Sequence, residues 1–359
     1  MKKFLTISLM AVLLLSSCVE ENVIERSDDH AIVFENAFVD KATRADITNE
    51  NIDEFSVYGY DQSYYGPFWV NERVYKIDEK SSWTYQNLAY WQKSRTYSIH
   101  AIAPYYKENE VSTWKFTHSG NLSNSIVNGN IAFTSDYDTD LVYANHCRSY
   151  GEYITGTPEP IQLTFKHLLS RVRIKIVNAM SNSLARVHVL DPAIGPFICD
   201  GNIDVSFDES VEPAWTLGNT SDVKTILNPI YRIYIQHENP HPEYAMDEVN
   251  KGEEGGVFNG AYISEPVYVI PQTKQAYSTV FSAELGFYHV LACNGYLDLT
   301  CMLPEEFTFE PGMSYQFTIT ITDDTIFNPE YLIKFEDIKV EPWAEWEDNK
   351  VNDAYNNIY

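Results

Sequence analysis

Short stretches in which apolar and polar residues alternate recur along most of the chain. Four of them are Phe55–Tyr60, Thr96–Ala103, Arg171–Val177 and Ser314–Thr322. A period of two residues is typical of a β-strand with one buried face. Turn-forming clusters such as Pro311–Gly312 lie between these stretches, and no helical periodicity is sustained. The pattern therefore predicts an all-β protein built from two sandwiches.

Chain length supports more than one domain. The chain has 359 residues, and single cores rarely grow beyond about 250–300 residues. A turn-rich stretch, Thr155–Pro160, precedes a strand with one basic and one apolar face. We therefore predict an N-terminal domain over residues 45–160 and a C-terminal domain over residues 161–359. Residues 19–44 are predicted to form a tether followed by one strand.

The first 18 residues have the form of a bacterial export signal. Two lysines precede an apolar run, Phe4–Leu15, and small residues then lead to Cys18. The run is shorter than the ~20 residues of a membrane-spanning helix, which favours a cleaved signal peptide. The cysteine resembles that of the bacterial lipoprotein box, whose thiol receives a diacylglycerol so that acyl chains hold the mature protein. An ordinary signal peptide with a coincidental cysteine is the alternative.

The net charge limits which classes of partner are expected, whereas the cysteine content leaves the disulfide pairing open. The formal net charge is −26, from 25 basic and 51 acidic residues. Such a chain is repelled by nucleic acid and by anionic lipid, so neither is expected as a partner. The 26 tyrosines fit sandwich cores and cross-strand pairs. The sequence leaves open the pairing of the four remaining cysteines, Cys147, Cys199, Cys293 and Cys301.

Motifs for catalysis or metal binding are weak. Residues 237–241 have the letters of a zinc-protease motif, but Pro240 interrupts the helix that such a site needs, so a loop is predicted. Residues 136–140 resemble the start of a calcium loop, yet Leu141 and Cys147 stand where an EF-hand requires glycine and glutamate. A looser calcium site and a solvated acidic turn both stay open there. We predict that the protein is not an enzyme and has no cofactor or metal, although glycosidase carboxylates leave no short signature.

Several short segments, spread over almost the whole exported chain, form a further pattern. They are Ile52–Tyr60, Ala89–Trp91, Tyr97–Tyr105, Leu163–Val172, Val269–Gln272, Pro311–Tyr315 and Ile338–Trp343. In this order they resemble the fimbrillins of Bacteroidetes, the subunits of lipoprotein-derived (type V) pili. The resemblance implies two transthyretin-like β-sandwich domains in tandem. It also implies an acylated precursor that travels to the outer membrane, where an arginine-specific, trypsin-like protease removes the N-terminal segment.

The resemblance gives the N-terminal segment a role in assembly. Arg44 and Ala45 flank the bond that the protease would cut, and Arg26 is a second candidate. The strand to be released has three large apolar residues on one face if it is extended, namely Ile32, Phe34 and Phe38. Its loss would expose an apolar cleft and an unpaired edge, which the strand of another subunit can fill.

The C-terminal region would supply such a strand to a neighbouring subunit. Its candidate donor segment carries Ile338, Val340 and Trp343. If residues 332–343 are instead the last strand of the second domain, the protein suits a tip or accessory position. Such a subunit accepts a strand but need not donate one.

The combined expectation is a structural or adhesive pilus subunit at the outer membrane and cell surface. Its expected partners are other fimbrial subunits, the maturing protease and a host or bacterial surface ligand. The alternative is a monomeric outer-membrane lipoprotein that keeps its N-terminal strand and binds glycan through exposed aromatic residues. Four tryptophans would serve that alternative unless core packing takes them, namely Trp69, Trp83, Trp91 and Trp114.

Overall fold

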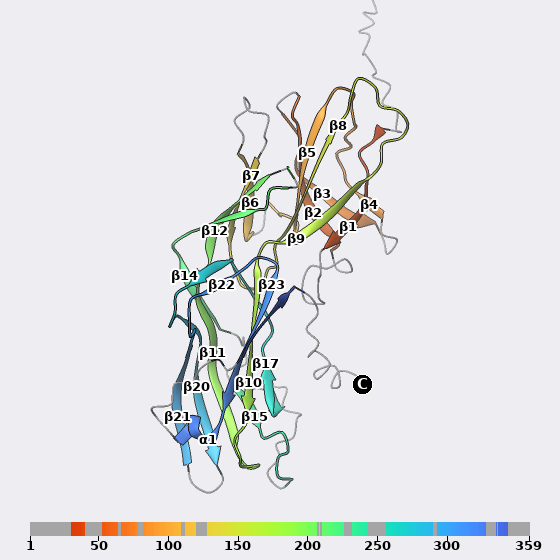
Figure 1. The fold of residues 1–359 in the computed structure, drawn as a ribbon. Coiled ribbons are helices and arrows are strands. Elements are labelled where there is room, and N and C mark those ends of the chain that lie inside the picture. Colours follow the sequence, from red (N-terminus) through yellow and green to blue (C-terminus); the bar gives the residue numbers. More distant parts are fainter. Residues whose placement is uncertain are drawn as a thin grey trace, which may run out of the picture.

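The all-β prediction is confirmed, because strands run through both lobes of an elongated molecule (Figure 1). This computed structural model describes residues 30–39, 52–63, 66–77, 82–108, 112–119, 128–206, 208, 210–225, 232–242, 256–289, 293–327, 335 and 337–343. Within these ranges the one α-helix is α1 (Asp323–Phe327), with 5 residues. No helix of the described residues has the length and hydropathy needed to cross a membrane.

A seven-stranded sheet forms much of the first lobe, in the order β1-β9-β8-β5-β2-β3-β4. Its strands are β1 (Phe34–Val39), β2 (Glu54–Asp61), β3 (Gly66–Ile77), β4 (Ser82–Thr84), β5 (Thr96–Ala103), β8 (Val142–Ser149) and β9 (Ile161–His167). A four-stranded sheet in the order β13-β12-β7-β6 covers one face, with a shared apolar core between the two sheets. Its strands are β6 (Trp114–Ser119), β7 (Asn128–Thr134), β12 (Asp200–Ser206) and β13 (Ala214–Leu217).

Strand β2 is buried on both faces, which its alternating sequence does not predict. Phe55 and Val57 lie in a core on one side of the seven-stranded sheet. Tyr58 and Tyr60 lie in the core between this sheet and the four-stranded sheet. Each of these side chains is at most 8% exposed. The period of two therefore marks two differently built apolar faces, rather than one apolar and one solvated face.

Both first-lobe sheets contain strands from either side of residue 160. β9 pairs with β8 and, in parallel, with β1. β12 pairs with β7 along its whole length. A boundary at residue 160 would divide both sheets, because backbone pairing joins segments that the turn signals set apart.

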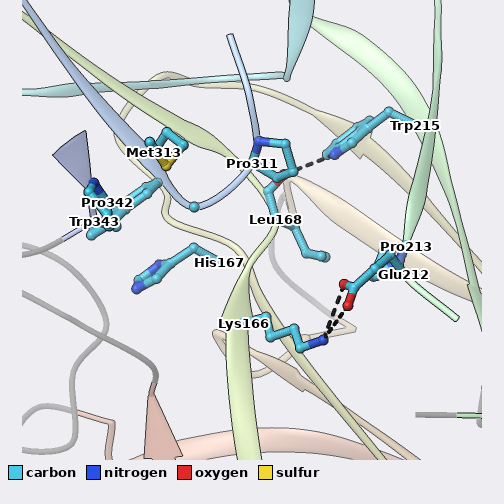
Figure 2. Close-up of a pocket in the computed structure, with 11 residues that line it drawn as sticks. Lys166, His167, Leu168, Glu212, Pro213, Trp215, Pro311, Met313, Pro342 and Trp343 are labelled. Carbon is cyan, nitrogen blue, oxygen red and sulfur yellow. Dashed lines mark hydrogen bonds and ion pairs between the residues drawn. The ribbon is translucent and has the colours of Figure 1, made fainter. Parts of the chain in front are cut away.

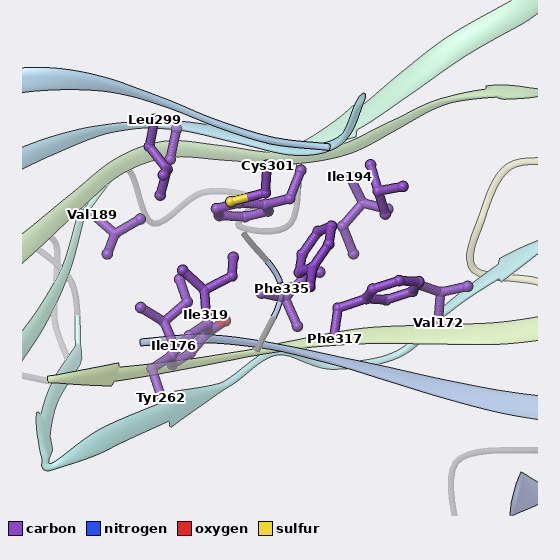
Figure 3. Close-up of a cluster of buried hydrophobic side chains, with 14 of the residues drawn as sticks. Val172, Ile176, Val189, Ile194, Tyr262, Leu299, Cys301, Phe317, Ile319 and Phe335 are labelled. Atoms are coloured by element: carbon purple, nitrogen blue, oxygen red, sulfur yellow. The ribbon is translucent and has the colours of Figure 1, made fainter. Parts of the chain in front are cut away.

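Two further sheets enclose the core of the second lobe (Figure 3). One has the order β17-β10-β23-β24 with β18 paired to β10, and the other has the order β16-β15-β11-β20-β21 with β14 paired to β11. β19 (Gln272–Lys274) and β22 (Phe307–Phe309) form a separate pair. The strands of the two larger sheets are β10 (Ser170–Asn178), β11 (Arg186–Ile198), β14 (Ser221–Thr225), β15 (Arg232–Gln236), β16 (Gly256–Asn259), β17 (Ala261–Ile263), β18 (Val267–Val269), β20 (Thr279–His289), β21 (Cys293–Met302), β23 (Met313–Ile321) and β24 (Asp337–Pro342).

Strand β10 continues almost directly from β9, so one stretch of chain runs through both lobes (Figure 1). β10 pairs in parallel with β23 along most of its length. Two of its three basic side chains are buried, with Arg171 only 1% and Arg173 only 2% exposed, whereas Lys175 is partly exposed. The guanidinium carbon of Arg171 lies 5.2 Å from the ring centroid of Trp343, and Arg171 Nε donates to Ser314 Oγ. The two arginines of the basic face read from the sequence are therefore part of the interior.

Candidate functional site: the seat of the N-terminal strand

The N-terminal segment is hydrogen-bonded to two different parts of the first lobe. Ile32 N–H donates to Ala89 O, and Trp91 N–H donates to His30 O, both at 2.9 Å between nitrogen and oxygen. From residue 34 onward the segment is strand β1, which pairs in parallel with β9. Residues 30–39 are therefore held by the segment 89–91 at their start and by β9 over the rest of their length.

This segment closes a curled sheet. β1 and β4 stand at opposite ends of the strand order, yet they lie against each other. An open sheet would present a row of unpaired backbone groups at its edge, and the N-terminal segment covers that edge on β9. Its removal would leave both β9 and the segment 89–91 without these partners and would open the first-lobe core to solvent.

Phe34 anchors the segment in that core. Its side chain is 3% exposed. Its ring centroid lies 6.0 Å from that of Phe55 and 5.9 Å from those of Trp69 and Tyr85. Burial of a large apolar side chain contributes about 1.5–3 kcal/mol, so Ile32 and Phe34 together contribute roughly 3–6 kcal/mol. Side-chain burial thus makes the first lobe and the segment interdependent.

Tyr85 is a further anchor, which no pattern in the sequence marks. Its hydroxyl donates to the backbone oxygen of Ile32. Burial raises the pKa of Tyr85 to about 12, so the hydroxyl keeps its proton near neutral pH. The residue belongs to no motif, and its sequence signal amounts to its place beside Trp83 in an aromatic-rich stretch.

The structure gives the side-chain burial of two of the three predicted strand-exchange residues, and for the third it gives the backbone pairing. Ile32 and Phe34 are buried in the first-lobe core. The register with β9 shifts after Phe34, and Ala37 is buried beyond the shift. The single face expected for the strand is therefore interrupted, and Phe38 is located by its backbone pairing with Thr164. The predicted lipidation and cleavage residues lie outside the described residues, namely Cys18, Arg44 and Ala45.

The candidate donor residues belong to a strand of the second lobe. β24 pairs antiparallel with β23 from Asp337 to Pro342. Ile338 packs against the second-lobe core, whereas Val340 is 45% exposed. Trp343, directly after the strand, is 1% exposed. Residues 337–343 are thus part of the second lobe's own sheet, which is one of the two arrangements that the sequence leaves open.

Trp343 also borders a cavity of about 440 Å³ at the junction of the lobes (Figure 2). On one side Lys166 Nζ lies 2.8 Å from Glu212 Oε1 in an exposed ion pair. Nearby, Trp215 Nε1 donates to Leu168 O at 2.9 Å. Side chains from the end of β9, from β13 and from the end of β24 therefore meet at this junction.

The residues of the weak catalytic and metal-binding motifs make ordinary structural contacts. Among the described residues, no group of three His, Cys, Asp or Glu side chains is placed to hold a metal ion. In the acidic turn, Asp138 Oδ2 lies 2.7 Å from Lys224 Nζ, and Asp136 accepts backbone N–H groups of the same turn. Residues 237–242 form a loop, as predicted, in which Asn239 N–H donates to His237 Nδ1.

The tryptophans considered for glycan binding are core residues. Trp69, Trp91 and Trp114 are each 2% exposed. Trp83 is partly buried and packs against the first-lobe core. The three buried rings have no open face to offer a ligand.

Known proteins of similar sequence or structure are pilus and adhesion proteins. The profile of a family described as fimbrillin-like matches residues 43–343. A fimbrial protein from Bacteroides vulgatus ATCC 8482 has a TM-score of 0.53 at 17% identity, covering 88% of this chain and 100% of that chain. A candidate cell adhesion protein from Bacteroides uniformis ATCC 8492 has a TM-score of 0.43 at 14% identity, covering 88% and 99%. The fimbrial anchor protein Mfa2 from Porphyromonas gingivalis has a TM-score of 0.34 at 9% identity, covering 87% and 97%. Among curated proteins no match was found.

Proposed function

Because the chain belongs to the fimbrillin-like family, we propose that it is a tip or accessory pilus subunit that accepts a strand from a neighbouring subunit. Family and fold identify a fimbrial or adhesin subunit. The more specific role is supported by one observation. The N-terminal segment closes the first-lobe sheet, while the last described strand is built into the second lobe.

The seat of the N-terminal segment has the properties of an acceptor groove. Once the segment leaves, an incoming strand regains the ladder on β9 and fills the space around Phe55 and Trp69 by strand addition. Ordering a free strand costs about 1–2 kcal/mol per residue. Burial of two large side chains does not offset this over the whole segment, so ladder hydrogen bonds at about 0.5–1.5 kcal/mol each must contribute.

The last strand of the described residues, β24, supports acceptance without donation. Withdrawing β24 would strip β23 of its antiparallel partner and would pull the buried Trp343 out of its core. Donating this segment to another subunit would therefore cost its own subunit the stability that these contacts provide. This asymmetry between the two ends favours a terminal position in a pilus.

In the proposed pathway, maturation of an acylated precursor releases the N-terminal segment. Cys18 carries the acyl chains that hold the precursor at the outer membrane, and a trypsin-like protease cuts between Arg44 and Ala45. The cut separates the segment with β1 from the rest of the chain at the cell surface. Assembly then requires a strand from another fimbrial subunit.

Brief native trypsin treatment of the exported protein tests the proposal. We expect one cut after Arg44 and a protease-resistant body that stays monomeric by light scattering, because β24, the last strand of the described residues, is paired within its own second lobe. Trypsin also cuts after lysine, and Lys41 lies three residues before Arg44, so the matched control carries both Lys41→Ala and Arg44→Ala and should keep the segment attached under the same conditions. Intact mass measurement distinguishes a cut at Arg44 from one at Arg26.

Two outcomes contradict the proposal. Ladders of the cut protein that survive cold SDS would show self-polymerisation and would assign a stalk role. A folded protein that is not cut at Arg44 would remove the strand-release step and favour a monomeric surface lipoprotein.

A further inference from the structure

A second cavity, of about 730 Å³, opens at the outer end of the first lobe. It lies where β8 ends beside the start of β5, at the end of the lobe that points away from the second lobe (Figure 1). The segment 88–93 and the loop residues 152–154 supply most of its walls. Cavities of about 300–1,000 Å³ are typical of small-ligand sites, so this one has room for a ligand of several rings.

Aromatic side chains line this cavity from its buried wall to its rim. Trp91 and Tyr97 are 2% and 4% exposed. At the rim Tyr153 is 74% and Leu88 is 61% exposed. Tyr153 is therefore among the large side chains that the fold leaves open to solvent, and it stands at the mouth of a cavity that already has an aromatic wall.

Polar groups of different kinds share the rim. Gln92, Lys93 and Glu152 are exposed there and offer an amide, an ammonium and a carboxylate. Asp61 also lines the cavity, and its carboxylate is held 2.5 Å from Arg95 Nη1. No single charge dominates this set. A ligand with many hydroxyl groups matches such a mixture of donors and acceptors better than a phosphate or a simple cation does.

The buried wall is held in place by the fold. Gln92 N–H donates to the Tyr97 hydroxyl oxygen at 2.9 Å. The rings of Trp91 and Tyr97 pack edge to face, with centroids 4.9 Å apart. Trp91 N–H is fixed by its bond to His30 O. A wall ordered before binding lowers the entropic cost of binding a ligand.

We infer that this cavity is a saccharide-binding site. The apolar C–H face of a sugar ring packs on Tyr153 and the neighbouring apolar rim, and the ring hydroxyls bond to Gln92, Lys93 and Glu152. The buried Trp91 takes no direct part in stacking. The inference concerns the intact chain, in which His30 of the N-terminal segment lines the cavity and holds Trp91 N–H.

Glycan-array binding followed by calorimetry tests the site. The full exported chain is applied to an array of animal and bacterial surface glycans, and the free oligosaccharide with the strongest signal is then titrated. We expect Tyr153→Ala to weaken its binding at least tenfold. The matched control is Tyr296→Ala, since Tyr296 is 68% exposed but lies on β21 of the second lobe. This control should bind as tightly as the natural chain.

Leu88→Ala supplies a second probe of the rim that spares the hydrogen-bonded wall, and it too should weaken binding. Thermal unfolding of each variant shows whether the fold is retained. The absence of binding to every glycan at millimolar concentration would overturn the inference. Equal affinity of the natural chain, Tyr153→Ala and Leu88→Ala would place any bound sugar elsewhere and overturn it as well.

Discussion

The imidazole of His167 and the indole of Trp343 stack face to face, with centroids 4.1 Å apart and planes inclined by 6°. His167 ends β9 in the first lobe, and Trp343 directly follows β24 in the second. On the imidazole, Nδ1 lies 3.0 Å from Asp140 Oδ2. Tyr268 stacks in parallel at a centroid distance of 5.7 Å from Trp343. The end of the last described strand is thereby fastened to the first lobe.

Replacement of Trp343 by alanine should lower the free energy of unfolding by about 3–5 kcal/mol, because it removes a fully buried ring and leaves a cavity. Chemical unfolding followed by circular dichroism measures the change. The control is Val340→Ala on β24, the strand just before Trp343; Val340 is 45% exposed, so this change should alter stability by less than about 0.5 kcal/mol. A similar small effect of both variants would show that the stacked rings do not hold the lobes together.

Phe34→Ala should loosen the N-terminal segment by about 3–5 kcal/mol, because Phe34 packs against three other aromatic rings. Hydrogen exchange of the segment 89–91 is the direct measurement, since its backbone loses partners when residues 30–32 leave. Exchange should accelerate there more than in the second lobe. Glu35→Ala alters the exposed neighbour and should leave exchange unchanged. Uniform acceleration over both lobes would mean that the segment does not open by itself.

Acid should destabilise the protein partly through His146. Burial, followed by repulsion from Arg148, lowers the pKa of His146 from 6.5 to about 4. The unfolded chain therefore binds a proton that the folded chain does not bind between these values, and stability is lost as the pH falls from about 6.5 to about 4. Partial exposure of His146 reduces this effect. We therefore expect His146→Gln to recover about 1–2 kcal/mol of the free energy of unfolding that the natural chain loses on acidification. Parallel stability curves for both proteins between pH 7 and pH 4.5 would contradict this assignment.

Cys301 should resist alkylation until the protein unfolds. Its side chain is 0% exposed, and burial raises the pKa of the thiol well above its ordinary range. Cys199 is also a free thiol, and burial raises its pKa as well. Iodoacetamide at pH 8 followed by peptide mass spectrometry should label Cys301 only after denaturant is added. A disulfide between Cys199 and Cys301 in the exported protein would refute this arrangement.

The sequence predicts strands well and their layering less well. The alternation in Phe55–Tyr60 locates β2, but it does not reveal that a second sheet covers the tyrosine face. The same holds for Arg171 and Arg173, whose charge suggests solvent although β10 is a central strand. Burial of the second face depends on segments distant in sequence, such as β12, which a local pattern cannot identify.

The candidate site was predictable only in its apolar residues. Ile32 and Phe34 are recognisable as the buried face of a strand, and both are buried. The register shift after Phe34 and the hydrogen bond from Tyr85 arise from contacts between residues far apart in the chain. Cross-strand register is not encoded in the alternation itself, so the sequence could not reveal the shift after Phe34.

The near-continuous path of β9 and β10 determines how the molecule should respond to a pulling force. One stretch of chain runs from Ile161 to Asn178 through both lobes, with β1 and β23 parallel to it. A pull along this path loads the ladders in shear, so that many hydrogen bonds resist together rather than breaking one after another. Tension entering one lobe passes to the other through the covalent backbone. The fold is therefore expected to carry tension along the backbone of β9 and β10, in addition to the side-chain contacts between its lobes.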